Sequence, residues 1–155
     1  MRLLYASALI AFALDQLSKW LIVWQMDLIT KRVIEVAPPY LTFIMGWNTG
    51  INFGLFAGSP GAVRWVLIGV AVAASLFVIV WGRRNFHRPV EFLSGGLIVG
   101  GALANGLDRL LYGAVADFLN MSCCGIDNPY TFNVADIFIF AGAFGLILFS
   151  REKGA

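Results

Sequence analysis

Aspartates that lie inside or next to apolar stretches are the residues through which this chain could do chemistry. They are Asp15, Asp108, Asp117 and Asp136, and the nearby positive charges are Lys19 and Arg109. An ionisable side chain in a membrane costs about 2.5 kcal/mol or more, so such residues persist where they pair or line a site. Two carboxylates held close together in a low dielectric cannot both ionise easily. One carboxylate and one carboxylic acid are therefore expected, a combination that can activate water and polarise a peptide carbonyl.

Other catalytic groups lack partners in the sequence. His87, the only histidine, lies in a basic segment, Ser18 and Ser94 have no evident base, and no His/Cys cluster has the spacing of metal ligands. The two cysteines, Cys123 and Cys124, are adjacent, which suits neither a disulfide framework nor a tetrahedral metal site. We interpret them as free small residues that fill an outer loop. We expect neither a metal nor a cofactor.

Predicted membrane spans are the elements that must position these aspartates. Of the 155 residues, 59% are hydrophobic and 13% are charged, about half the charged fraction of a soluble domain. This composition excludes disordered and coiled-coil proteins and, with a net charge of only +2, argues against nucleic-acid binding. A span needs about 20 mainly apolar residues. Four stretches of a single predicted domain, residues 1–155, meet or nearly meet this length: residues 3–24, 62–81, 92–111 and 135–149.

The basic residues near the ends of these spans predict the orientation of the chain. Cytoplasmic loops carry an excess of Lys and Arg. Six basic residues fall before the first span, between the second and third, or after the fourth, against three on the opposite side. Both termini are therefore predicted to face the cytoplasm. The six are Arg2, Arg83, Arg84, Arg88, Arg151 and Lys153, and the three are Lys31, Arg32 and Arg64.

Two longer connections are predicted on the outer side. Residues 25–61 contain β-prone runs such as residues 40–44, with Pro38, Pro39 and several glycines as turns. They predict a small sheet or cradle at the membrane surface, while residues 112–134 are rich in turns. The predicted fold is an all-α membrane protein: four transmembrane helices with a small extracytoplasmic β-cradle between the first and the second.

The polar residues of the spans are predicted to meet at one level of the bilayer. At a rise of about 1.5 Å per residue, Asp15 lies about 18 Å into the first span and Asn105 about 20 Å into the third. Asp108 follows at about 24 Å, and Asp136 lies at the outer mouth of the fourth span. A strand that returns after the third span could bring Asp117 to the same place. The site is therefore predicted in the outer half of the bilayer.

Two pairs of polar residues are spaced so that they share a helix face. Asp15 and Lys19 are four residues apart, which is compatible with a structural ion pair and with a direct role towards substrate. Asn105 and Arg109 are also four residues apart, and Arg109 could neutralise a carboxylate or hold a substrate carbonyl. Asp108 could be the partner of an arginine or a residue of the helix end.

Four blocks of sequence, in order along the chain, resemble those of one protein family. Residues 15–19 (DQLSK) match the pattern D-x-x-S-K, residues 48–54 (NTGINFG) match N-x-G-x-x-F-G, and residues 132–136 (FNVAD) match F-N-x-A-D. Residues 100–109 (GGALANGLDR) are similar to a longer block, which continues with Gly113, Val115, Asp117 and Phe118. The chain thus resembles the bacterial lipoprotein signal peptidases (signal peptidase II), a family of intramembrane aspartyl proteases.

The resemblance implies a reaction, partners and a place in the cell. The family removes the signal peptide from prolipoproteins whose cysteine already carries diacylglycerol, and it cleaves just before that cysteine. The implied partners are this substrate, membrane lipid and the cyclic peptide inhibitor globomycin; no nucleic acid is expected, and the protein is expected to be a monomer. The implied location is the bacterial cytoplasmic (inner) membrane, which the chain crosses several times, with the active site towards the outer leaflet.

The resemblance also implies roles for individual residues. Asp117 and Asp136 are the expected catalytic dyad of a metal-independent endopeptidase. The residues expected to surround or support the substrate site are Asn48, Gly50, Asn105, Arg109, Asn133, Asp15, Lys19 and Asp108. Apart from the resemblance, the topology suggests the hypothesis that residues 25–61 clamp the extended signal peptide through backbone hydrogen bonds. Ala104 and Asn52 depart from the family pattern, and no role is assigned to Asn52.

Two other classes of function are compatible with parts of the sequence. A small four-helix transporter would explain aspartates within the membrane, but neither an aspartate in an outer loop nor a long β-prone segment. A non-catalytic assembly factor would make the same acids purely structural. Replacement of Asp117 by Asn separates these classes, because a protease then loses proteolysis while it still folds and inserts into the membrane.

Overall fold

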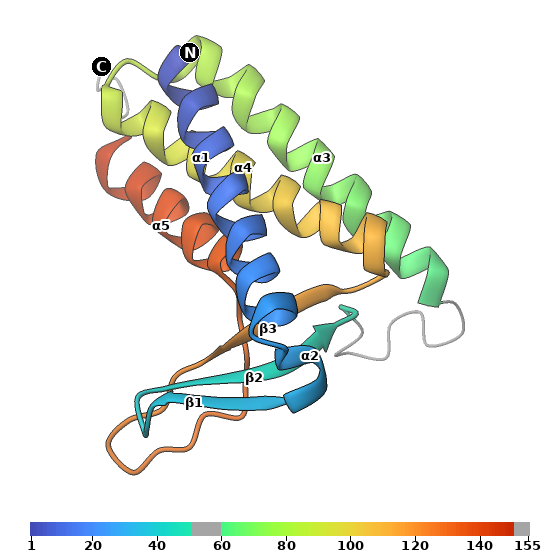
Figure 1. Ribbon diagram of the computed structural model, residues 1–155. Helices are drawn as coiled ribbons and strands as arrows, with labels where there is room; N and C mark the ends of the chain where they lie inside the picture. The colour runs from blue at the N-terminus through green and yellow to red at the C-terminus, as the bar shows by residue number, and fades with distance from the viewer. Residues whose placement is uncertain (51–59, 151–155) are drawn as a thin grey trace.

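Among residues 1–50 and 60–150, four long helices lie alongside one another, and a small sheet lies at one end of them (Figure 1). The computed structural model describes residues 1–50 and 60–150. Within these residues, a π-helical segment, η1, extends the first long helix, and a short helix, α2, leads into the sheet. The elements are α1 (Arg2–Lys19), η1 (Trp20–Gln25), α2 (Leu28–Lys31), β1 (Val33–Ala37), β2 (Leu41–Asn48), α3 (Pro60–Asn85), α4 (Pro89–Tyr112), β3 (Val115–Asn120) and α5 (Val134–Phe149).

Three helical segments of the described chain are long and apolar enough to cross a membrane. They are Arg2–Gln25, Gly61–Asn85 and Pro89–Tyr112, each of 24 or 25 residues. These segments contain the first three predicted spans. Helix α5 is apolar but has only 16 residues. The fourth span, predicted from a short apolar stretch, therefore stays a prediction.

Helix α4 lies at the centre of the bundle, in contact with α1, α3 and α5. Two glycines let its neighbours come close. A Cβ atom on Gly100 would lie 2.8 Å from the Cβ atom of Ala11 in α1, and one on Gly101 would lie 2.6 Å from the carbonyl oxygen of Ala135 in α5. Both distances are too short for a side chain. Small residues therefore fix the spacing between α4 and the two helices that carry polar residues towards it.

The sheet joins two parts of the chain that are far apart in sequence. Its order is β1-β2-β3, and both pairs of strands are antiparallel. β1 and β2 come from the segment predicted to form a cradle, whereas β3 follows α4. The chain is therefore not purely helical, and the sheet predicted between the first two spans is completed by the strand that returns after the third. Residues 51–59, which include Asn52 and part of the N-x-G-x-x-F-G block, lie outside the described residues, as do Arg151 and Lys153.

The two faces of the sheet have different surroundings. Alternate residues of a strand point to opposite faces, and one face packs on a cluster of buried apolar side chains contributed by η1, α2, β2 and β3. Asp117 lies between two members of this cluster in β3, so its side chain points to the opposite face. The apolar packing therefore presents this aspartate away from the core of the sheet. The buried members of the cluster are Val23, Leu28, Phe43, Met45, Ala116 and Phe118.

Candidate active site

A buried lysine lies between aspartates from two helices. The Nζ atom of Lys19 is 2.7 Å from a carboxylate oxygen of Asp15 in α1 and 2.7 Å from one of Asp108 in α4. Both aspartate side chains are fully buried, and that of Lys19 is 6% exposed. Of the two roles left open for Asp15 and Lys19, the structure shows the ion pair, and Asp108 pairs with this lysine and not with an arginine. Because an unpaired buried charge is costly, the three side chains depend on one another.

The same two aspartates hold the segments that carry the other carboxyl groups. Oδ1 of Asp15 accepts a hydrogen bond of 2.8 Å from the backbone N–H of Ala135, in the first turn of α5. Oδ2 of Asp108 accepts one of 3.2 Å from the backbone N–H of Ala116, in β3. The residues that follow these two alanines are Asp136 and Asp117. The ion-paired cluster therefore fixes the backbone directly before both candidate catalytic residues.

Asn105 connects the ion-paired cluster to Asp136. Its Oδ1 accepts hydrogen bonds from Nζ of Lys19 (3.3 Å) and from Nδ2 of Asn133 (3.1 Å). Its Nδ2 donates to Oδ1 of Asp136 at 3.0 Å. An ammonium group can only donate, so Lys19 determines which end of the Asn105 amide faces Asp136. The amide is thereby oriented as a donor towards this carboxylate.

Asn133 joins the two candidate catalytic carboxyl groups. As the N-cap residue of α5, it accepts a hydrogen bond of 3.0 Å at Oδ1 from the N–H of Asp136, and its own N–H donates to Oδ2 of Asp136 at 3.2 Å. Its Nδ2 donates to Oδ1 of Asp117. Reciprocal capping of this kind is a common way to begin a helix. The F-N-x-A-D block therefore encodes a helix start and, at the same residue, the link between Asp117 and Asp136.

Asp117 is held in a nearly closed environment, with 3% of its surface exposed. Its second oxygen accepts a hydrogen bond of 3.0 Å from Nδ2 of Asn48, at the end of β2. The N–H of Gly50, whose φ of +76° favours glycine, in turn donates to Oδ1 of Asn48 at 2.9 Å. Burial, reinforced by the charge of Asp136, raises the pKa of Asp117 to about 6 against the opposing effect of the hydrogen bonds from Asn48 and Asn133. Asp117 therefore keeps its proton to a higher pH than an exposed aspartate does.

Arg109 borders the network and makes no ion pair with any residue that the structure describes. Its Nη1 donates a hydrogen bond of 3.3 Å to the backbone carbonyl of Asn105. Its Nε is buried and has no hydrogen-bond partner among residues 1–50 and 60–150, where it also makes no salt bridge. A buried donor without an acceptor is costly. Of the two roles predicted for Arg109, the ion pair with a carboxylate is absent from the described chain, and the contact with a substrate carbonyl stays a prediction.

The residues predicted for the site lie in one connected network, with one participant that the sequence analysis missed. Gln16 donates hydrogen bonds to Oδ1 of Asp108 (3.0 Å), to Oδ2 of Asp15 (3.3 Å) and to the backbone carbonyl of Ala104 (3.4 Å). A polar amide inside an apolar span was the available signal for it. In the described part of the chain, no group of three or more His, Cys, Asp or Glu side chains is arranged to bind a metal ion.

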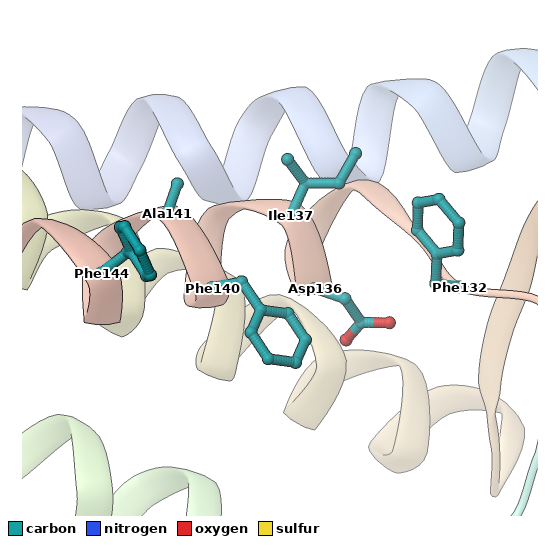
Figure 2. A pocket seen from close by; sticks show the side chains of 6 residues that line it. All are labelled: Phe132, Asp136, Ile137, Phe140, Ala141 and Phe144. Carbon is teal, nitrogen blue, oxygen red and sulfur yellow. The ribbon is translucent and has the colours of Figure 1, made fainter. Parts of the chain in front are cut away.

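Two cavities of different chemistry open beside the two aspartates. One, of about 700 Å³, runs along α5, and Figure 2 shows the Asp136 carboxylate among the apolar side chains that line it. The other, of about 190 Å³, lies beside Asp117 and has a more polar lining. The first is lined by Phe132, Asp136, Ile137, Phe140, Ala141 and Phe144, and the second by Gly46, Trp47, Asn48, Thr49, Asp117, Pro129, Tyr130 and Thr131.

The sequence is similar to one known family and to proteins that belong to it. The model of the family described as Signal peptidase (SPase) II matches residues 7–151. The lipoprotein signal peptidase of Methylorubrum extorquens (strain PA1) is 43% identical over 148 residues, which cover 93% of this chain and 85% of that protein. The lipoprotein signal peptidase of Methylobacterium radiotolerans is 41% identical over 135 residues, which cover 87% of this chain and 77% of that protein.

Two solved structures share the fold of the chain. A bacterial membrane enzyme determined by the in meso method at 1.9 Å resolution superposes with a TM-score of 0.80 over 96% of this chain and 92% of that one, at 23% sequence identity. A second structure of a bacterial membrane enzyme, at 2.3 Å resolution, gives a TM-score of 0.76 over 97% of this chain and 92% of that one, at 22% identity. The likeness covers nearly the whole chain and shows a shared fold.

Proposed function

The chain belongs to the signal peptidase II family, and from this premise we propose that Asp117 and Asp136 are the catalytic dyad of an aspartyl endopeptidase. The chain is a membrane-embedded protease that removes signal peptides from prolipoproteins. The observation that carries the proposal for the dyad is the shared asparagine: Asn133 donates to the carboxyl group of Asp117 while it caps the helix turn that holds Asp136. The side chain of Asn133 therefore fixes the relative position of the two carboxyl groups.

The surroundings of the two aspartates suit them to different roles, one as a general acid and the other as a general base. Asp117 is the acid of the pair, because burial keeps it protonated to a higher pH. Asp136 is the base of the pair. It lies in the first turn of α5, where the positive end of the helix dipole stabilises a negative charge, and each of its oxygens accepts a hydrogen bond, from Asn105 and from the N–H of Asn133.

The reaction follows from these two roles. Asp136 takes a proton from a water molecule, the water oxygen attacks the scissile carbonyl carbon, and Asp117 gives its proton to the carbonyl oxygen. The resulting tetrahedral diol collapses when Asp136 gives its proton to the leaving nitrogen. The carbon–nitrogen bond then breaks, and a hydroxyl group of the diol returns a proton to Asp117. Both aspartates end in the states in which they began.

Each of the two cavities binds a different part of the substrate, one beside Asp136 and the other beside Asp117. The large apolar cavity along α5 takes the acyl chains of a diacylglyceryl group, because its walls beyond Asp136 are aromatic or aliphatic. The small cavity beside Asp117 takes the peptide residues on the other side of the scissile bond. The Nε atom of Arg109, which has no partner in the described part of the chain, donates to a backbone carbonyl of the substrate. Cleavage then falls just before the lipidated cysteine, and the cyclic peptide globomycin competes for the same space.

The short fourth helix suits an active site below the membrane surface. With 16 residues, α5 is about 24 Å long, against about 30 Å for the hydrocarbon core. The first residue of α1 and the end of α5 lie at the end of the bundle opposite the sheet (Figure 1). A chain with four spans and cytoplasmic termini in the bacterial inner membrane therefore places Asp136 within the outer leaflet, where the lipid of a substrate resides. One copy of the chain supplies every residue of the proposed site.

The experiment that tests the dyad is cleavage of a diacylglyceryl prolipoprotein by the purified protein in detergent, with a chelator present. The Asp117→Asn and Asp136→Asn variants are expected to lose cleavage and to keep the helical circular dichroism of the wild type. Asp127→Asn is the matched control, because Asp127 lies in the segment between the two and is exposed; it is expected to cleave at the wild-type rate. Cleavage by either dyad variant at a rate within tenfold of the wild type would refute the assignment.

A further inference from the structure

The two cysteines of the chain form an exposed pair in the segment between β3 and α5. Cys123 and Cys124 are the only cysteines among the 155 residues, and both are exposed and free of disulfide bonds. The Sγ atom of Cys123 lies against the Sγ atom of Cys124. The two sulfur atoms therefore lie on the same side of the backbone and face each other.

The turn that carries the pair is unusual for a cysteine. The N–H of Ile126 donates a hydrogen bond of 2.9 Å to the carbonyl of Cys123, and the two central residues, Cys124 and Gly125, have φ values of +61° and +79°. Two positive φ values in succession are the pattern of a type I′ turn, which favours asparagine or aspartate followed by glycine. Turn stereochemistry therefore explains Gly125 but not Cys124. Another property, the reactivity of the thiol next to its neighbour, accounts better for a cysteine at this position.

From these two observations, we propose that Cys123 and Cys124 are a reversible oxidation site that closes into a vicinal disulfide ring. The oxidant is a disulfide, either a small one such as glutathione disulfide or that of a thiol oxidase. The thiolate of Cys124 attacks this disulfide, forms a mixed disulfide and expels one thiol. The thiolate of Cys123 then attacks the Sγ of Cys124, closes the ring and expels the second thiol. Two cysteine thiols are oxidised, one disulfide is reduced, and the two protons of the cysteines end on the two expelled thiols.

The ring is expected to be labile. Adjacent Cα atoms are about 3.8 Å apart across a trans peptide bond, whereas the Cα atoms of ordinary disulfides are about 4.4 to 6.8 Å apart. Disulfides with distorted geometry are more easily reduced than structural ones. The pair is therefore suited to reversible oxidation by a thiol–disulfide buffer, and not to a permanent cross-link.

The segment that bears the pair also forms a wall of the small cavity beside Asp117. Nδ2 of Asn120 donates to the carbonyls of Asn128 (2.7 Å) and Tyr130 (2.9 Å), which ties the far side of the segment to the end of β3. Tyr130 lines the cavity, together with its sequence neighbours on either side. Closure of the ring therefore stiffens a segment that contacts substrate. This consequence rests on the proposed function. The same function places the pair in the oxidising compartment outside the cytoplasm.

The test is the intact mass of the full-length protein in detergent after incubation with glutathione disulfide and then N-ethylmaleimide under denaturing conditions. The wild type is expected to lose the mass of two hydrogen atoms, to take up no maleimide and to remain a monomer. Dithiothreitol is expected to restore two maleimide adducts. Because the chain has two cysteines, any internal disulfide is this pair.

Single-cysteine variants provide the controls. Cys124→Asn introduces the residue type that the turn favours and keeps the thiol of Cys123, whereas Cys123→Ser keeps the thiol of Cys124. Each variant is expected to take up one glutathione or one maleimide. Neither is expected to lose the mass of two hydrogen atoms. Two maleimide adducts, two glutathione adducts or disulfide-linked dimers as the main product of the wild type would overturn the proposal. The mass readout does not depend on proteolysis, so a failure of the proposed dyad leaves it unaffected.

Discussion

Replacement of Lys19 by methionine is expected to destabilise the fold far more than the loss of one surface charge. The substitution keeps a long unbranched side chain but removes the ammonium group that lies 2.7 Å from both Asp15 and Asp108. Breaking a buried ion pair by removal of one partner costs about 3–5 kcal/mol. Two buried carboxylates lose the same partner here, so we expect the free energy of unfolding to fall by about 5 kcal/mol at neutral pH.

The loss is also expected to reach the catalytic site. Without the ammonium group, Oδ1 of Asn105 loses the donor that fixes the orientation of its amide. The orientation in which the Asn105 amide donates to Asp136 then competes with the flipped orientation, in which the amide oxygen faces this carboxylate. In the folded fraction of Lys19→Met, we expect a lower kcat for cleavage of a lipidated prolipoprotein, with a smaller change in KM.

The assay is unfolding by titration with dodecyl sulfate in mild detergent, followed by the fluorescence of the 5 tryptophans. Lys31→Met is the matched control, because Lys31 is exposed and its Nζ donates to one backbone carbonyl; it is expected to change stability by less than about 0.5 kcal/mol. The double variant Lys19→Met, Asp108→Asn is expected to recover part of the loss, since it removes one uncompensated charge. A Lys19→Met variant within about 1 kcal/mol of the wild type, or a double variant less stable than the single one, would refute the reasoning.

Three further perturbations address the acid, the helix packing and the apolar cavity. Burial raises the pKa of Asp117 from 3.8 to about 6, so the folded state binds this proton more tightly than the unfolded state does. As the pH rises from about 4 to about 6, the free energy of unfolding of the wild type, relative to that of Asp117→Asn, should therefore fall by up to about 3 kcal/mol. A difference that stays constant with pH in unfolding titrations would contradict this. Gly101→Ala, whose Cβ atom meets backbone of α5, should lower the free energy of unfolding by about 1–3 kcal/mol, whereas Gly69→Ala, with nothing within 4 Å, should leave it unchanged. Phe140→Ala should raise KM for the lipidated substrate in steady-state cleavage assays, and Phe77→Ala, on the exposed face of α3, should not; equal effects would argue against the cavity as the lipid site.

Features that depend on local spacing could be predicted from the sequence. The first three spans follow from runs of apolar residues, and the ion pair of Asp15 with Lys19 follows from a separation of four residues on one helix. The strand that returns after α4 could be expected from the distance between the third span and Asp117. In each case the interacting residues are close in sequence, or the length of the element limits the possibilities.

Features that depend on tertiary packing could not be predicted in the same way. The partner of Asp108 proved to be Lys19, 89 residues away in sequence, and not the adjacent arginine. The pairing of β3 with β2 and the hydrogen bonds of Gln16 likewise depend on how α1 and α4 pack. The double role of Asn133 is hidden in a short motif, because one end of its amide caps a helix and the other contacts a distant strand.

The most direct test of the account separates binding from chemistry in the two dyad variants. The affinity of Asp117→Asn and of Asp136→Asn for a diacylglyceryl prolipoprotein would be measured at equilibrium, and the rate of a single turnover would be measured on the same preparations. We predict affinities within a few-fold of the wild type and turnover slowed by about a thousandfold or more, the range expected for loss of a general acid or base. A variant that binds and cleaves at a rate close to that of the wild type, or variants that lose binding and fold together with cleavage, would contradict it.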